Sequence, residues 1–408
     1  MYSSITGLLM LTAICTVTGG LAAVMYTETV QCFIMVIGAV IVAAKAFWKV
    51  GGWEALETKY MISRPPENEI PEKFINCSHP SPYAFKMLRP YDDPDLPWLG
   101  FLLGQTFASL WYWAADQVVV QRLLAAKSLA HAQGGTLFAG FLKTLPLFLI
   151  IVPGMISRVL YPSEIACVDP EKCYAHCENH ASCSNAAYPT LVMELMPDGL
   201  RGLMMAGMLA ALMSGLASIF NSASTMFTID IWPQIRKKAS LRELMIVGRA
   251  FVVVMVLISI LWIPVIEEMQ GGQIFIYIQA ISAYLAPPIA TVFVLAVMWT
   301  RMNEPGAFWS LVIGLLAGVI RMILDVIYKQ PPCGEDDLRP FLIRKIHYMY
   351  FAIVLVCLSS LTAVIVSLLT EPTEKFRVIK FIVNLSNKYV KRLIKYAAIC
   401  PINFMSAL

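Results

Sequence analysis

Charged residues are scarce in this chain. Lys, Arg, Asp and Glu make up 14% of its 408 residues, whereas they make up about a quarter of a typical soluble domain. Apolar residues make up 58% and stand in long blocks, so a soluble fold would have too little polar surface to cover itself. The five histidines are scattered, and the sequence has no nucleophile constellation or phosphate-binding loop. We therefore expect a membrane protein, not an enzyme, with no cofactor and no nucleic-acid partner.

Basic residues before the apolar residues 1–25 and a small-residue cleavage site after them are also missing, so we expect this segment to be a spanning helix rather than a signal peptide. Alternating strand patterns of the barrel type are absent. Backbone groups in lipid must bond internally, so the long apolar blocks are predicted to be helices. An all-α polytopic protein with about nine transmembrane helices is expected. The predicted spans are 5–24, 30–49, 98–120, 137–160, 203–231, 244–266, 273–299, 306–328 and 347–369.

Lys and Arg orient these spans. Basic connections follow the third, fifth and seventh spans, and a basic tail follows the last. All four regions fall on one side when the spans alternate, and that side is predicted to be the cytoplasm. We expect a transmembrane core over residues 1–370 and a cytoplasmic tail over 371–408. The amphipathic tail suits either solvent or the surface of an anionic lipid bilayer.

The longer loops, near 51–97, 161–189 and 329–346, then lie outside. Asn76 begins a glycosylation sequon, Asn-Cys-Ser. Six cysteines lie in these loops, and their spacing suits zinc, but an oxidising side favours disulfides. Four of them can pair within the second loop in three ways, which leaves the other two for each other. The loop cysteines are Cys77, Cys167, Cys173, Cys177, Cys183 and Cys333.

Four stretches of the sequence resemble the sodium/solute symporter family, in its sodium/sugar cotransporter branch. They are 18–31 (TGGLAAVMYTETVQ), 110–122 (LWYWAADQVVVQR) with GFLK at 140–143, 211–224 (ALMSGLASIFNSAS), and 301–307 (RMNEPGA) running into Gly314 and Gly318. The resemblance implies a LeuT-like inverted-repeat transporter fold. By that resemblance the chain starts part-way into the fold, lacks the discontinuous first repeat helix and lacks the final helix. It therefore looks like a truncated isoform or a partial gene product.

Aromatic and charged side chains inside the spans suggest a sugar site. Trp111, Tyr112 and Trp113 could stack on the apolar face of a sugar ring, although interfacial aromatic residues are the alternative. Charges inside spans are expensive and often functional, which singles out Asp116 and Lys143. The two could also form a structural ion pair. The resemblance implies that the aromatic residues and Lys143 contact sugar and that Asp116 lies near the inner gate.

Two further polar residues match family positions. Gln279 can read a pair of hydroxyls because an amide both donates and accepts. The resemblance implies that it contacts sugar, whereas an interhelical hydrogen bond is the alternative. Glu28 lies on the predicted inner link between the first two spans. An acidic residue is usual there in the family, which implies a gating or coupling contact.

A sodium site is implied at Ala211, Ser214 and Gly215. The family commonly has a second hydroxyl where this chain has Gly215, and further ligands come from the first repeat helix. Coordination by this chain alone is therefore predicted to be partial. A packing face of small residues is the alternative for this stretch.

The resemblance implies sodium-coupled uptake of glucose, another hexose or myo-inositol across the plasma membrane, with sodium as the co-transported ion. Residues 268–273 (EMQGGQ) lean toward the inositol-type members. The alternative is a transport-incompetent chain that acts as a binding or regulatory partner. Neither the stoichiometry nor an accessory membrane protein can be read from the sequence.

Overall fold

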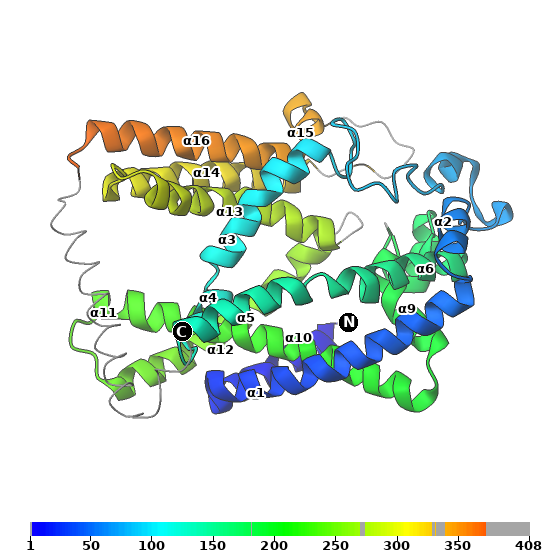
Figure 1. Ribbon diagram of the computed structural model, residues 1–408, viewed down its shortest axis with the longest axis horizontal. Coiled ribbons are helices and arrows are strands. Elements are labelled where there is room, and N and C mark those ends of the chain that lie inside the picture. The colour runs from blue at the N-terminus through cyan, green and yellow to red at the C-terminus, as the bar shows by residue number, and fades with distance from the viewer. Residues whose placement is uncertain (1, 181, 270–273, 329–330, 332–338, 373–408) are drawn as a thin grey trace, which may run out of the picture.

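The structure is a computed structural model that describes residues 2–180, 182–269, 274–328, 331 and 339–372 (Figure 1). Every regular element of this described part is a helix. Seven stretches of it are long and apolar enough to cross a membrane, which confirms the all-α polytopic class. Those stretches are 28–50, 129–160, 198–235, 241–264, 275–298, 304–327 and 348–369.

The helices fall into two groups. In Figure 1 the upper group contains α3 (Gln105–Ala114), α13 (Ile274–Met298), α14 (Glu304–Ile327) and α16 (Tyr348–Leu369). The lower group contains α1 (Tyr2–Val50), α10 (Asp198–Met226) and α12 (Leu241–Met269), with α5 (Leu129–Leu142) and α6 (Val152–Leu160) beside them. The remaining elements are α2 (Trp53–Met61), η1 (Glu67–Glu69), η2 (Glu72–Cys77), η3 (Gly100–Gly104), α4 (Gln117–Leu124), η4 (Leu147–Ile151), α7 (Pro162–Ile165), α8 (Pro170–Cys177), η5 (Ser184–Ala186), α9 (Ala187–Leu195), η6 (Phe227–Ile231), α11 (Trp232–Ile235) and α15 (Phe341–Lys345).

The first two predicted spans form one helical element, α1, rather than two helices joined by a link. Ala13 belongs to the same apolar cluster as Phe220 of α10, and Glu28 bonds to Ser218 of α10. In Figure 1 the N-terminus lies near mid-length of α1 and not beyond either of its ends, as it would if the 49-residue element were straight. Helix α1 therefore changes direction along its length. The direction change predicted near Glu28 is present, but the backbone remains helical through it.

The third predicted span, 98–120, is not one helix. It consists of the π-helical η3, α3 and α4, with a break at Ala115 and Asp116. Asp116 has extended backbone angles, and its carboxylate accepts a 3.0 Å hydrogen bond from the backbone N–H of Val118. An aspartate in this position caps α4 and satisfies one of the free N–H groups at the helix start. Its charge is thus used locally, at a helix break of the kind that lines sites in transporters.

Small residues bring α14 close to its neighbours. Gly306, Ser310, Gly314 and Gly318 recur every fourth residue, and all four are buried. The hydroxyl of Ser310 donates to the backbone carbonyl of Ser359 on α16 at 2.8 Å. Because residues four apart lie close together along a helix, these small residues form a stripe on α14. The stripe lets the backbones of α13 and α16 approach the backbone of α14 closely, as in other membrane helix pairs.

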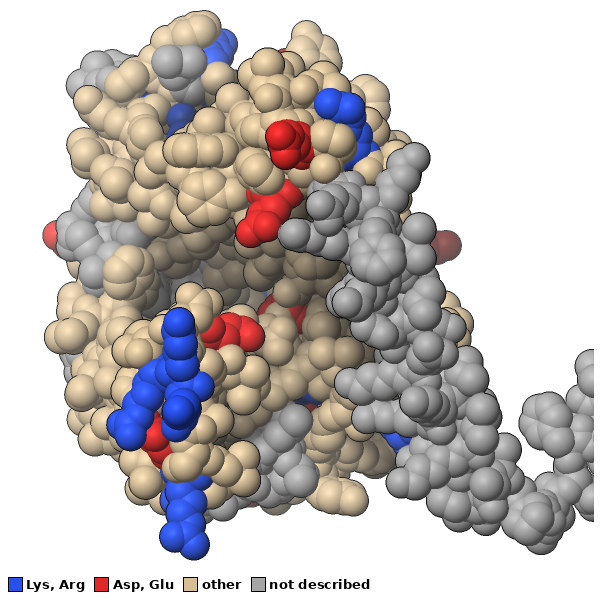
Figure 2. All heavy atoms as spheres, turned by 90° about the vertical axis from the view of Figure 1, so that its left-hand side faces the viewer, with Lys and Arg blue, Asp and Glu red and all other residues tan. Residues whose placement is uncertain are grey.

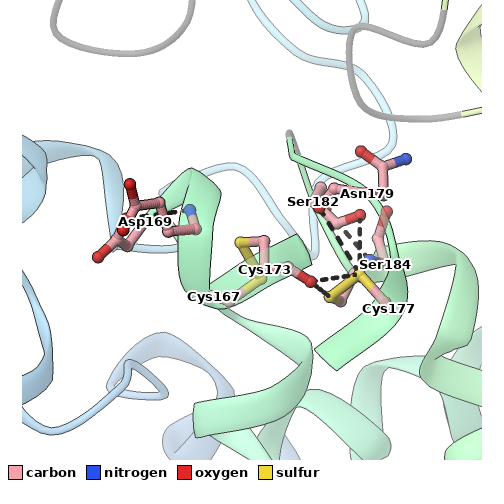
Figure 3. The surroundings of a disulfide bond; sticks show 9 residues. Cys167, Asp169, Cys173, Cys177, Asn179, Ser182 and Ser184 are labelled. Atoms are coloured by element: carbon pink, nitrogen blue, oxygen red, sulfur yellow. Dashed lines mark hydrogen bonds between the residues drawn. A yellow bond between two sulfur atoms is a disulfide. The ribbon is translucent and has the colours of Figure 1, made fainter. Parts of the chain in front are cut away.

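Two disulfides fix the second long loop. Cys167 pairs with Cys173 and Cys177 with Cys183, with Cα–Cα distances of 5.5 and 5.6 Å (Figure 3). The sequence left three pairings and a zinc site open, and the structure has this one disulfide pairing. Asp169, which precedes α8, caps that helix: its carboxylate accepts a hydrogen bond from the backbone N–H of Glu171.

The other two loop cysteines and the sequon are less fully described. Cys77 is also disulfide-bonded, while Cys333, which was predicted to pair with it, lies outside the described residues. Asn76 lies in η2, but its side chain is outside the described part of the chain. Tail residues 373–408 also lie outside it.

The connections between the long helices lie toward two opposite ends of the molecule, as expected for spans that alternate in direction. Of the elements in or beside the long loops, α2 and α9 lie toward the right of Figure 1, and α15 lies at its top near the start of α16. The basic connection from α11 to α12 and the last turn of α16 lie at the left. Seen from that left end, the molecule is hollowed between the two groups of helices, with Lys and Arg side chains gathered on its lower part (Figure 2). A hollow that opens between helix groups can admit water and solutes from one end.

A half-buried histidine makes the start of α16 sensitive to pH. His347 caps α16 by accepting from the N–H of Met349, and burial lowers its pKa to about 4, with Asp93 opposing and Arg321 adding to the shift. Because the folded state binds this proton more weakly than the unfolded chain, the free energy of unfolding falls as the pH drops below about 6.5. We expect a loss of about 1 kcal/mol between pH 7.5 and 5.5.

Thermal unfolding of the purified chain at several pH values measures this loss. His347→Asn keeps a side-chain cap acceptor and removes the titration, so its melting temperature is expected to vary less over the same pH range. An unchanged pH dependence in that variant would contradict the assignment to His347.

Candidate functional site

Glu28 is the centre of a polar network between α1, α4 and α10. Its carboxylate pairs with Arg122 through two 2.8 Å contacts, so the pair is bidentate. The hydroxyls of Ser214 and Ser218 each donate to Glu28 Oε1, at 2.7 and 2.8 Å. Ser218 Oγ also accepts a 2.6 Å hydrogen bond from Arg122. Charge-assisted bonds of this kind are the strong ones, and here they join helices that lie far apart in the sequence.

This network contains one of the three predicted sodium residues. The hydroxyl of Ser214 donates a hydrogen bond to Glu28, so the lone pairs of the Ser214 oxygen remain able to face a cation. Gly215 lies on open space, since a Cβ built there would meet no atom within 4 Å. Ala211 supplies no side-chain oxygen. Glu28, Ser214 and Ser218 are therefore the side chains here that can offer oxygen to a hard cation such as sodium.

Lys143 caps the end of α5 and lies over two aromatic rings of α3. Its ammonium nitrogen is 3.8 Å from the centre of the Tyr112 ring and 4.7 Å from that of Trp113. The two rings meet edge to face, with centroids 5.5 Å apart. A cation so placed is attracted by both ring faces. The structure thus brings together three of the predicted sugar-site residues.

The structure places Trp111 and Asp116 elsewhere. Trp111, one residue before Tyr112, lines an apolar groove of about 280 Å³ with Phe293 and Val297 of α13. Among the ion pairs of the described residues, none joins Asp116 to Lys143, because Asp116 is the cap of α4. The structural pair proposed between these two charges is therefore not formed.

Gln279 forms a hydrogen bond between helices. Gln105 Nε2 of α3 donates to Gln279 Oε1 of α13 at 2.8 Å, and both side chains are half-buried. The interhelical bond that was the alternative for Gln279 is thus present. This bond uses one donor of Gln105 and one lone pair of Gln279, so both amides keep further donors and lone pairs for a ligand.

Sequence reasoning missed Arg122, Ser218 and Gln105 as site residues. Arg122 ends the family-like stretch 110–122 and was given no role, and Ser218 lies one helical turn after Ser214, which its i, i+4 spacing could have indicated. Gln105 was an amide inside an apolar span, which is itself a signal. Gln121, next to Arg122, is bonded to Ser222 and Thr225 of α10 and extends the polar seam between α4 and α10.

The arrangement of broken helices with polar side chains at their interfaces is that of a membrane transporter. The Sodium:solute symporter family matches residues 1–314, and the chain belongs to this family. A solved structure titled as a substrate-bound, outward-open Na⁺-coupled sialic acid symporter is similar with a TM-score of 0.58 and 19% identity. The match covers 90% of this chain and 66% of that chain, and it supports the inverted-repeat transporter fold.

Closer relatives are also found. Rabbit (Oryctolagus cuniculus) Sodium/myo-inositol cotransporter 2 is 54% identical over 375 residues, which is 92% of this chain and 55% of the relative. Its human (Homo sapiens) counterpart has the same identity and coverage over 378 residues. Mouse (Mus musculus) Sodium/myo-inositol cotransporter is 55% identical over 382 residues, with 92% and 53% covered. The chain thus spans about half the length of the curated relatives it matches.

Proposed function

We propose that this chain carries the sodium-coupled transport of a neutral polyol, with myo-inositol as the first substrate to test. The observation that carries the proposal is the Glu28 network, in which a carboxylate holds two hydroxyls of α10 at a helix interface. The names of the similar relatives support both sodium and myo-inositol as partners. They also favour a transporter over an enzyme.

The proposed mechanism assigns each group a part. Sodium approaches Glu28 and Ser214 and draws the carboxylate away from Arg122, since one carboxylate cannot serve both cations equally. The polyol lies between α3, α13 and the end of α5, where Gln279 meets hydroxyls and Tyr112 and Trp113 cover the ring. Lys143 donates to a hydroxyl from above the aromatic rings. Movement of one helix group against the other would expose both solutes to the opposite side.

We further propose the plasma membrane as the location, with the long loops outside. The disulfides at Cys167–Cys173 and Cys177–Cys183 support an oxidising environment for the second loop. The basic connections at the opposite end support a cytoplasmic placement for that end and for the tail. Glycosylation at Asn76 belongs to the same proposal.

Uptake of labelled myo-inositol and glucose, with and without sodium, tests the function in cells that express the chain at their surface. A chimera that places the N-terminal segment of the rabbit relative before this chain runs beside it, because the chain spans about half of that relative. Sodium-dependent myo-inositol uptake by either protein supports the proposal. If both reach the surface and neither transports, the proposal is wrong and the alternative of a transport-incompetent partner gains.

A further inference from the structure

Two amides face each other across the interface of α3 and α13. The bond from Gln105 Nε2 to Gln279 Oε1 is 2.8 Å long and joins positions 174 residues apart. Large apolar side chains near this pair, Leu102 and Leu103 of η3 and Phe275 of α13, are exposed to the surroundings. A polar pair inside such a segment is expensive unless a partner or a ligand satisfies it.

The pair keeps most of its hydrogen-bonding capacity. Each amide has two N–H donors and a carbonyl with two lone pairs, and the mutual bond uses one donor and one lone pair. Among the described residues, neither amide has another hydrogen-bond partner. Three N–H donors and three lone pairs therefore remain, and half-burial leaves them within reach of a solute. The pair is uncharged, so it suits neighbouring hydroxyls, which both donate and accept, better than an ionic group.

Gln105 shares a helix face with Tyr112. The two residues are seven positions apart on α3, which is two turns and about 10 Å along the axis. Tyr112 carries the ammonium of Lys143 over its ring at 3.8 Å. One face of α3 thus has a neutral amide pair at one end and a cation held over aromatic rings at the other. Between them there is length for a six-membered ring with its rim of hydroxyls.

We propose that Gln105 is a specificity-determining residue that contacts a hydroxyl of the polyol jointly with Gln279. The mutual bond orients both amides, so the unused groups of Gln105 meet the same edge of the ring that Gln279 meets. This proposal rests on the proposed function, because it names a contact in that same site. It adds a residue that sequence comparison with the sugar-site pattern did not single out.

The substitution Gln105→Met tests the contact, because methionine keeps the length and flexibility of the side chain and removes its hydrogen bonds. Binding of myo-inositol to the purified chain is read from ligand-induced thermal stabilisation and from Trp fluorescence. We expect the affinity for myo-inositol to fall about tenfold, which is the effect of losing one hydrogen bond to a ligand hydroxyl. A panel of monodeoxy inositols identifies that hydroxyl. The analogue that lacks it is expected to bind the variant and the wild type equally.

Controls separate contact from folding. Thr106→Val changes the next residue of α3, whose exposed hydroxyl bonds to the Leu102 carbonyl of its own helix, and is expected to leave binding unchanged. If Gln105→Met does not fold, Gln105→Asn withdraws the amide by one methylene and is expected to show the same selective loss.

Three results would overturn the proposal. Unchanged affinity in both Gln105 variants excludes the contact, and an equal loss for every deoxy analogue shows that Gln105 only shapes the helix interface. In both cases the wild-type chain still binds the polyol, so the proposed function stands. If the wild-type chain binds neither myo-inositol nor glucose, the same variants are read in the chimera with the N-terminal segment of the rabbit relative. The proposed function and this proposal fail together only if that chimera binds neither solute.

Discussion

Replacing Gly318 by alanine is expected to lower the free energy of unfolding by about 3 kcal/mol, the upper part of the range for overpacked interiors. A Cβ at this position would lie 2.0 Å from the backbone carbonyl oxygen of Tyr284 and 3.0 Å from its carbonyl carbon. Backbone cannot turn aside as a flexible side chain can, so α13 and α14 must separate. That separation also strains the hydrogen bond from the Tyr284 hydroxyl to Asp325, and with it the Arg321–Asp325 pair.

Thermal unfolding of the purified variant, together with its yield of monodisperse protein, measures this loss. Gly202→Ala is the matched control, because a Cβ there meets no atom within 4 Å and α10 is a regular helix at that point. Alanine is the better helix former, so the control is expected to be neutral or more stable by up to about 1 kcal/mol. Equal melting temperatures for the two variants would show that α13 and α14 are not packed backbone to backbone at Gly318.

Much of the helical architecture could be predicted from the sequence, because lipid leaves the backbone so few options. The long apolar blocks correspond to helices, and the ends of α13, α14 and α16 lie within a few residues of the predicted spans. Arg321 and Asp325 form an ion pair at 3.4 Å, and their i, i+4 spacing on one helix is enough to expect it. The glycines of the family-like stretch were visible as a pattern, but their contacts with Tyr284 and Pro288 were not.

The interior of the candidate site could not be predicted in the same way. Apolar content does not reveal that α1 stays helical through its change of direction, nor that Asp116 caps a new helix instead of lying inside a long one. Contacts such as Arg122 with Glu28 or Gln105 with Gln279 join positions 94 and 174 residues apart. Periodicity carries information only within one element, so such pairs need either the structure or a family pattern.

Glu28→Gln is expected to raise the sodium concentration needed for half-maximal response about tenfold, the equivalent of one charge-assisted hydrogen bond. The carboxylate holds Ser214 with its proton directed away from the candidate cation position, and it supplies the negative charge of the network. A neutral amide keeps the shape but weakens both contributions. Because Arg122 competes for the same carboxylate, Arg122→Gln is expected to shift the sodium dependence in the opposite direction.

Sodium-induced thermal stabilisation of the purified chain measures this response without requiring transport, and sodium-dependent myo-inositol uptake gives a second readout. Glu243→Gln is a close control, because Glu243 is as buried as Glu28, with side chains 20% and 19% exposed, and it pairs with Arg236 at 3.2 Å. Arg236 follows α11 and Glu243 lies in the first turn of α12, so losing this pair removes a similar interaction away from Ser214 and should leave the sodium response unchanged. If Glu243→Gln shifts the sodium dependence as much as Glu28→Gln, the effect comes from net charge, and Glu28 has no special place in sodium binding.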